Sequence, residues 1–163
     1  MTRPPRERPV LNKRRAARFA AVQALYQVEL LGERPEVVVR EFGEHRLARL
    51  FEPFEVEEPS PRVDREWFEI VVKGAWAARG RLDPEIEACL ADGWTLARCG
   101  YLLRACLRAG AYELAERTDV PVKVVINEYV EVAHLFFDGS EPAFVNAVLD
   151  RLAPRLRLSE AAL

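Results

Sequence analysis

The stretch 102–152, LLRACLRAGAYELAERTDVPVKVVINEYVEVAHLFFDGSEPAFVNAVLDRL, decides the fold. Its apolar residues recur every three or four positions in three successive runs, which is typical of helices that bury one face. Two short polar stretches, TDVP at 118–121 and DGS at 138–140, separate the runs. Pro near the start of a helix and Gly after its end are usual helix boundaries. The stretch therefore predicts three helices joined by two tight turns.

The boundaries of these helices follow from local signals. Thr95 is a good N-cap for the first helix, which is expected to continue through Gly100 and Gly110. An interior Gly costs about 1 kcal/mol relative to Ala. We therefore expect a neighbouring helix to approach closely at both glycines. Asp119 is the predicted N-cap of the second helix, and Ser140 starts the third.

Upstream of this stretch the chain continues to read as helix. Predicted helices span 12–31, with Asn12 as N-cap, and 36–51, where the periodicity is weaker. Another helix begins at Asp64, and a short one follows Asp83-Pro84 over 84–90. No segment has the alternation of a strand. The sequence predicts an all-α protein, a compact bundle of about seven helices.

The domain organisation is predicted to be simple. Residues 1–12 read as a flexible basic arm, and 13–163 as a single helical domain, with two lobes (13–92 and 93–163) as the alternative. Half of the residues are hydrophobic, which is enough for a substantial core. No run of 18 apolar residues occurs, so no membrane span is expected. Three cysteines without a C-x-x-C motif predict free thiols and a cytoplasmic protein.

The net charge of −2 hides an asymmetry. Residues 1–18 carry a charge of +6 and the remainder carries −8. A basic arm attracts polyanions, whereas an acidic body suits a basic partner. Polyanion binding is therefore predicted for four basic residues at the start of the first helix: Lys13, Arg14, Arg15 and Arg18. The alternative is that these side chains pair with acidic groups of the body.

Signs of enzymatic chemistry are missing from the sequence. Neither a glycine-rich phosphate loop nor H-E-x-x-H occurs, and the two histidines, His45 and His134, are far apart. Glu128 and Glu131 lie one helical turn apart and read as a solvated face or as salt-bridge partners. We expect no enzyme activity, no cofactor and no metal site.

A second nucleic-acid contact is predicted near the start of the last helix, at Phe144 and Asn146. Backbone N–H groups at a helix start suit a phosphate, and an aromatic ring suits a splayed base. A core position for Phe144 is the equally open alternative. Asn127 reads as a buried or half-buried cap to a neighbouring loop or helix end, with ligand contact as the alternative.

Three motifs in the deciding stretch resemble one known family. YEL at 112–114, DVPxKVxINE at 119–128 and FVNxVLD at 144–150 match the NusB family in order and spacing. RRAAR at 14–18 and ALYQ at 24–27 resemble the start of the same family. The resemblance covers the chain except for residues 1–12 and roughly 33–64.

The resemblance implies a NusB-like fold and a non-enzymatic adaptor in bacterial transcription antitermination. Such an adaptor binds boxA RNA of ribosomal RNA leaders together with the ribosomal protein NusE, and joins other Nus factors on RNA polymerase. By position, the resemblance assigns RNA contact to the four basic residues of the first helix and to Phe144, and NusE contact to Tyr26. Some family members form homodimers, and the sequence leaves this open.

Two departures and two rival functions remain. Leu103 stands where the family often has an acidic residue, and His134 stands where it has Lys. One rival is the NusB-like RNA-binding domain of ribosomal RNA cytosine methyltransferases, although the 163 residues leave no room for a cofactor-binding α/β domain. The other is a helical protein–protein adaptor that does not bind RNA.

Overall fold

The computed structural model describes residues 12–51 and 62–157. The predicted arm and the proline-rich segment 52–61 lie outside these ranges, apart from Asn12. The described residues form six α-helices: α1 (Lys13–Leu31), α2 (Pro35–Glu41), α3 (Arg65–Glu87), α4 (Tyr101–Glu116), α5 (Val122–Phe136) and α6 (Glu141–Leu156). A π-helical turn (Phe42–Arg46) and a 3₁₀ turn (Leu47–Arg49) follow α2, and a 3₁₀ turn (Leu96–Cys99) precedes α4. The described ranges hold no strand, so the all-α prediction is confirmed, with six α-helices where about seven were expected.

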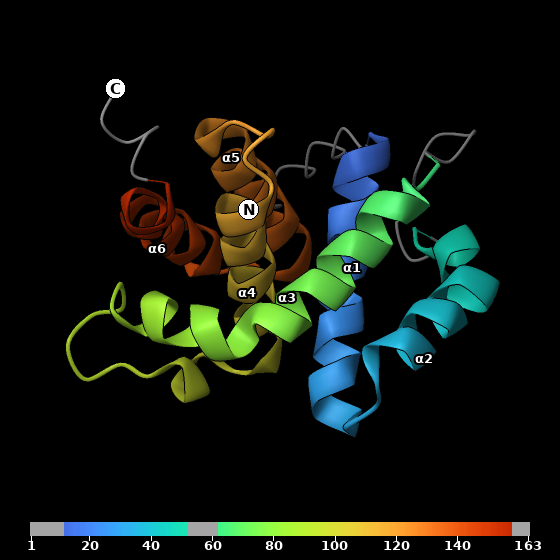
Figure 1. Ribbon diagram of the computed structural model, residues 1–163, viewed down its shortest axis with the longest axis horizontal. Coiled ribbons are helices and arrows are strands. Elements are labelled where there is room, and N and C mark those ends of the chain that lie inside the picture. Colours follow the sequence, from blue (N-terminus) through green and yellow to red (C-terminus); the bar gives the residue numbers. More distant parts are fainter. Residues whose placement is uncertain (1–11, 52–61, 158–163) are drawn as a thin grey trace, which may run out of the picture.

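Helix α4 lies at the centre of the bundle, as its broad apolar surface predicts. It packs against α1, α3, α5 and α6 (Figure 1). Helix α3 crosses in front of α1, α2 flanks these two at one side, and α6 lies at the opposite side against α5 (Figure 1). Helix α5 packs against both α1 and α6 and so lies between them.

Helix α1 begins and ends where the sequence predicts. The Asn12 side chain accepts a hydrogen bond from the backbone N–H of Arg15 at 2.8 Å, and caps the first turn. Gly32 ends the helix in the left-handed conformation, with φ of 67°. The Asp64 carboxylate caps α3 in the same way, through the N–H of Trp67 at 3.0 Å. These two predicted N-caps are confirmed.

The two glycines predicted inside one long helix behave differently. Gly100 has φ of 77°, a conformation that side chains disfavour, and it separates the 3₁₀ turn from α4. The prediction that a helix from Thr95 runs through Gly100 was therefore wrong. At Gly110 a Cβ would lie 2.9 Å from Cδ1 of Leu149 on α6. The close helix approach predicted at Gly110 is confirmed.

Two predicted caps are used elsewhere. Helix α3 continues through Pro84 to Glu87, so the prediction of a separate helix over 84–90 was wrong. Leu82 and Ile86, on either side of Pro84, are both fully buried. The Asp83 carboxylate binds Arg108 and does not cap a helix. Helix α5 begins after Pro121 without a side-chain cap, so the Asp119 prediction was wrong as well.

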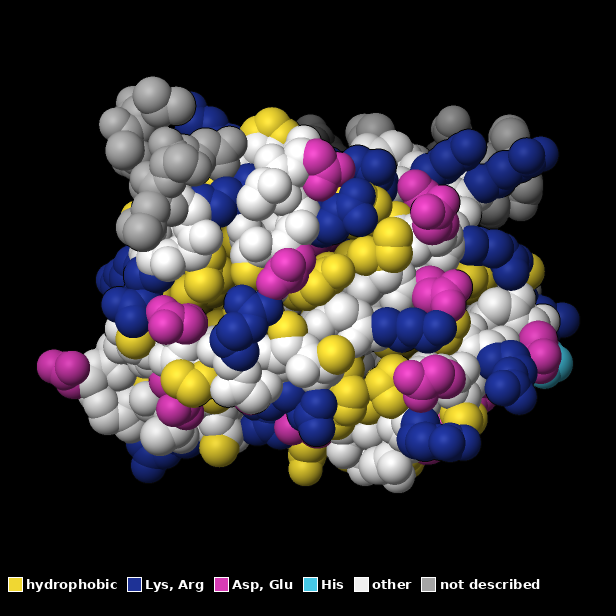
Figure 2. Space-filling model, in the orientation of Figure 1, with side chains coloured by type: hydrophobic (Ala, Val, Ile, Leu, Met, Phe, Trp, Pro, Cys, Tyr) yellow, Lys and Arg dark blue, Asp and Glu magenta, His cyan; other side chains and the backbone are white. Residues whose placement is uncertain are grey.

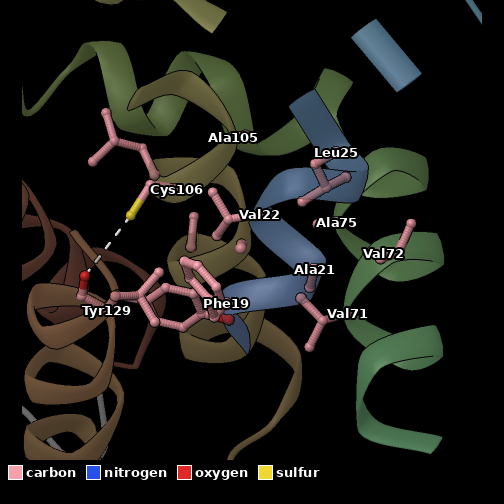
Figure 3. Close-up of a cluster of buried hydrophobic side chains, with 14 of the residues drawn as sticks. Phe19, Ala21, Val22, Leu25, Val71, Val72, Ala75, Ala105, Cys106 and Tyr129 are labelled. Carbon is pink, nitrogen blue, oxygen red and sulfur yellow. Dashed lines mark hydrogen bonds between the residues drawn. The ribbon is translucent and has the colours of Figure 1, made fainter. Parts of the chain in front are cut away.

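One core joins all six helices. Figure 3 shows its centre, where side chains of α1, α3, α4 and α5 interdigitate. The Cys106 thiol donates to the backbone carbonyl of Tyr129 at 3.8 Å, and burial raises its pKa to about 12. All three cysteines are free, as predicted, with Cys89 also buried and Cys99 half-buried. No helix within the described ranges combines the length and the apolar character needed to cross a membrane.

Candidate nucleic-acid interface

The four predicted basic residues of α1 have different environments. Lys13 and Arg14 are exposed on the first turn, Arg15 is half-buried, and Arg18 is only 2% exposed. Helix α1 turns about 100° per residue, so side chains that are adjacent in the sequence point in different directions: Arg15 toward α5 and Arg18 into the core. The cluster that reads as continuous in sequence is thus divided between the surface and the interior.

Arg18 is an interior residue with an acidic partner. Its Nε and Nη2 donate to the two carboxylate oxygens of Glu113 on α4, at 2.9 and 2.8 Å. The Tyr129 hydroxyl donates to the same carboxylate. Burial raises the pKa of Tyr129 well above its usual value, so the phenol stays protonated. Burial also opposes the charge on Arg18, but the hydrogen bond and charge of Glu113 raise the Arg18 pKa overall.

Arg15 ties α1 to α5. Its Nε and Nη2 donate to Glu128 at 2.8 and 2.9 Å, and the two side chains are 16% and 13% exposed. The hydrogen bond from Arg15 to Glu128 raises the arginine pKa. Glu128 is therefore a salt-bridge partner, one of the two predicted roles, whereas Glu131 is exposed. The pairs of Arg15 and Arg18 hold the start of α1 against its neighbours.

Arg14 lies against an aromatic ring that sequence reasoning missed. Its guanidinium carbon is 3.9 Å from the ring centroid of Trp67 on α3, and its Nε is 3.9 Å from Asp64. Arg117, just after α4, also packs on Trp67, at 4.5 Å. The only local signal was the position of Trp67, three residues after the N-cap Asp64.

Phe144 and Asn146 lie apart from the basic residues. Phe144 is half-buried and packs against the core, and Asn146 is exposed on α6. Because α5 lies between α1 and α6, it separates this pair from the start of α1. Asn127 on α5 is exposed, so the prediction of a buried or half-buried cap was wrong, and ligand contact stays open. An RNA that touches both groups has to cross α5.

Charge is mixed on the face drawn in Figure 2, where Lys and Arg side chains alternate with Asp and Glu. The described residues of that face therefore form no single basic stripe. Nor does any cluster of three or more His, Cys, Asp or Glu in the described ranges fit a metal ion. On this face, binding of a polyanion would depend on local arrangements of cations rather than on a uniformly positive surface.

Tyr26 lies in an apolar groove. Its ring is 36% exposed and meets Tyr101 edge to face, with the centroids 6.4 Å apart. The groove has a volume of about 700 Å³. It lies between α1, the turns after α2, the start of α4 and the end of α5. The residues that line it are Phe19, Gln23, Tyr26, Gln27, Leu30, Leu31, Arg46, Leu50, Leu102, Leu135 and Phe136. Leu30 and Leu31 are 46% and 59% exposed. Exposed apolar side chains around a hollow are typical of a protein-docking surface.

An ionic network borders this groove. Glu29 accepts hydrogen bonds from Arg104 and Arg108 on α4, and Arg108 also binds Asp83 through two bonds of 2.9 and 2.8 Å. The Arg104 guanidinium lies 4.6 Å from the centroid of Tyr101. Leu103 precedes Arg104 on α4, and the negative charge beside this arginine comes from Glu29 on α1.

Comparisons with known proteins agree on one family. The model of the NusB family matches residues 15–154. Transcription antitermination protein NusB of Sinorhizobium fredii is 46% identical over 159 residues, which are 96% of this chain and 97% of that protein. The NusB protein of Rhizobium etli is 48% identical over 158 residues, 95% of each chain.

Solved structures show the same similarity. NusB of T. maritima has a TM-score of 0.72 and 26% identity, covering 94% of this chain and 100% of that one. A crystal structure of the antitermination factors NusB and NusE in complex with double-stranded RNA has a TM-score of 0.69 and 25% identity, covering 86% and 96%.

Proposed function

The chain belongs to the NusB family of transcription antitermination proteins, and from this premise we propose that it binds boxA-type single-stranded RNA together with the ribosomal protein NusE. The family is not one of enzymes, and the chain is a transcription antitermination protein. In our proposal the RNA and NusE contacts bring it to the other Nus factors and RNA polymerase in the cytoplasm, during ribosomal RNA transcription.

The division of the α1 arginines carries the RNA half of the proposal. Arg15 and Arg18 are fixed by two-bond pairs to Glu128 and Glu113, so the first turn of α1 has a defined position. That turn presents Lys13 and Arg14 to solvent, directly after the basic arm. In the proposal Lys13 and Arg14 contact phosphates, Arg15 contributes its remaining exposed edge, and Arg18 holds the helix in place.

Phe144 and Asn146 are the proposed base-contacting residues. Phe144 keeps part of its ring at the surface, and the exposed Asn146 lies on the other side of the buried Val145 in the same turn of α6. Stacking of one base on an aromatic ring contributes about 1–3 kcal/mol. A strand that runs from the start of α1 across α5 to α6 would pass the exposed Asn127.

The groove at Tyr26 is the proposed docking site for NusE. Its apolar lining and the exposed Leu30 and Leu31 supply surface to bury, and the acidic body suits a basic ribosomal protein. The structural neighbour that contains both NusB and NusE supports this half of the proposal. A second copy of the chain is the alternative occupant.

The RNA test is a fluorescence-anisotropy titration of the full chain with a boxA-like single-stranded RNA and a scrambled control, with and without NusE. We expect selective binding that NusE tightens. The double variant Lys13→Ala/Arg14→Ala should weaken it, and the slope of log K against log salt should fall by about 0.7 for each phosphate that is no longer neutralised. Arg155→Ala, which removes an exposed arginine on α6, is the matched control.

The partner test uses Tyr26→Ala, which truncates the ring that lines the groove. We expect it to reduce the effect of NusE without changing the binding of RNA alone. Equal weak binding to both RNAs, unaffected by NusE, would contradict the proposal and point to a function through protein partners alone. Sedimentation of wild type and Tyr26→Ala distinguishes NusE docking from self-association, because only self-association changes the mass of the protein alone.

A further inference from the structure

We infer that Trp67, with the guanidinium groups of Arg14 and Arg117 packed on its ring, forms a second phosphate-binding point for the RNA. This extends the interface from α1 to the turn between α4 and α5. The inference rests on the proposed function, since it concerns the same RNA. The family resemblance of the sequence does not point to Arg117 or to Trp67.

The geometry places the two cations close together. Their guanidinium carbons lie 3.9 and 4.5 Å from the Trp67 centroid, so their separation cannot exceed the sum of these two short distances. The backbone N–H of Asp64 donates to the carbonyl of Lys13 at 3.1 Å and holds the start of α3 beside the start of α1. Three segments distant in sequence therefore converge at one indole ring. Two guanidinium groups at such spacing suit one phosphodiester or two adjacent ones.

Trp67 itself has an unused donor. The ring is 3% exposed, and its Nε1 is buried without a hydrogen-bond partner among residues 12–51 and 62–157. A buried N–H without an acceptor is unfavourable, and such groups in native proteins call for an explanation. A phosphate oxygen that reaches the edge of the ring between the two arginines would supply the acceptor.

Both arginines are available to an incoming anion. Their side chains are 47% and 29% exposed, and the carboxylates beside them, on Asp64 and Asp119, are also accessible. Arg117 binds Asp119 through two bonds of 3.2 Å, and this hydrogen bonding lowers the pKa of Asp119. Ion pairs at the surface are weak and are readily replaced. A phosphate can therefore displace these carboxylates, whereas it cannot displace the interior partner of Arg18.

The backbone at Arg117 is held in place by another arginine. Arg157, at the end of α6, is buried and donates to the carbonyls of Glu113, Leu114 and Arg117 at 2.9, 2.6 and 2.8 Å, and to that of Val120. The turn after α4 is therefore anchored on its inner side. The Arg117 side chain extends from this anchored turn to the ring of Trp67, so the phosphate-binding point has a defined position before RNA binds.

The test compares Arg117→Gln with the matched control Arg155→Gln, an exposed arginine of α6 that is paired with Glu85 at 2.8 Å. Anisotropy titrations with boxA-like RNA are run at several salt concentrations. For Arg117→Gln we expect several-fold weaker binding and a salt slope reduced by about 0.7, the value for one neutralised phosphate on a single strand. Arg155→Gln should match wild type. Arg117→Lys, which keeps the charge, should restore most of the slope.

A second measurement uses the ring directly. The chain has three tryptophans, so replacing Trp76 and Trp94 by Phe leaves Trp67 as the sole indole emitter. We expect RNA to change its fluorescence, with a smaller change in the additional presence of Arg117→Gln.

The outcomes separate this inference from the proposed function. If wild type binds no RNA, the proposed function fails. If wild type binds RNA and Arg117→Gln has the same affinity and slope, the inference is overturned. A loss of affinity without a change of slope also overturns it, because a phosphate contact has to release counterions.

Discussion

At the scale of single residues, Glu113 is the point where three helices meet. It belongs to α4, binds Arg18 of α1 with both oxygens, and accepts a hydrogen bond from the hydroxyl of Tyr129 of α5. The sequence indicated a basic first helix but not which of its arginines are interior. Arg18 and Glu113 are 95 positions apart, and no local pattern reveals a pair at that separation. In the sequence alone, the exposed and the buried arginines at the start of α1 cannot be distinguished, because their acidic partners lie far away along the chain.

Removing the charge of Glu113 should be costly. In Glu113→Gln the buried Arg18 guanidinium loses its two-bond counter-charge and keeps Glu128, at 3.8 Å from its Nη1. Breaking a buried pair on one side typically costs about 3–5 kcal/mol. We expect a loss of that size in the free energy of unfolding, measured by urea denaturation. Glu85→Gln removes an acid from the exposed pair with Arg155, and should cost less than about 1 kcal/mol.

A compensating variant checks the cause. Arg18→Met added to Glu113→Gln removes the stranded charge, and part of the lost stability should return. If the double variant is no more stable than Glu113→Gln, an unpaired charge is not the reason for the loss.

At the scale of helices, local signals predicted boundaries wherever the capping side chain had no stronger partner. Asn12 and Asp64 cap α1 and α3 as expected. Asp83 and Asp119 have equally good capping chemistry, but arginines bind both, and neither caps a helix. The sequence could not show this, since Arg108 reaches Asp83 from a helix 25 positions later. Arginine partners, 25 positions away for Asp83 and two positions away for Asp119, decide which of these four acid or amide residues act as caps.

Two helical glycines should respond to Ala in opposite directions. At Gly110 the new methyl would press on Leu149, and overpacking typically costs about 1–3 kcal/mol. Gly80 lies within α3 with nothing within 4 Å of an added Cβ, so Gly80→Ala should stabilise by about 0.5–1 kcal/mol. Thermal and urea unfolding of both variants provide the comparison. Equal effects at the two sites would contradict the close approach of α4 and α6.

The end of α6 stabilises the end of α4. Arg157→Ala removes a charged donor from four backbone carbonyls. A hydrogen bond to a charged group contributes about 1.5–3 kcal/mol net, and such contributions within one network do not add. We expect a loss of roughly 2–4 kcal/mol and faster hydrogen exchange in the turn 117–121. Arg151→Ala is the control on the same helix, since Arg151 donates to the carbonyl of Cys89 at 3.2 Å, away from this turn. Unchanged exchange in the turn would show that Arg157 does not hold it.

At the scale of the whole molecule, the apolar periodicity predicted the helical bundle, and the motifs predicted its family. The groove at Tyr26 was not predictable, because it is assembled from four separate segments whose arrangement depends on packing. Tyr26 was found only through the family resemblance. The same dependence on packing holds for Trp67, where segments from α1, α3 and the end of α4 meet.

Because the core is continuous, we expect the protein to unfold in a single step. Buried residues of all six helices belong to one cluster, and α4 packs against α1, α3, α5 and α6. We therefore expect one cooperative transition, with equal calorimetric and van't Hoff enthalpies and coincident curves from circular dichroism and tryptophan fluorescence. Two separated transitions would instead support lobes that unfold independently near the boundary at residue 92.

The pair of Arg18 and Glu113 also has a consequence for how such sequences diverge. A mutation at either position alone leaves a buried charge without its partner, so most single steps lead to a poorly folding intermediate that selection removes. Descendants of this gene are expected to keep both residues or to exchange both. The surface residues Arg14 and Arg117 carry no such mutual constraint from folding, so they can drift separately and change how the protein meets its ligand. Divergence in this lineage should therefore alter the binding face long before it alters the centre of the bundle.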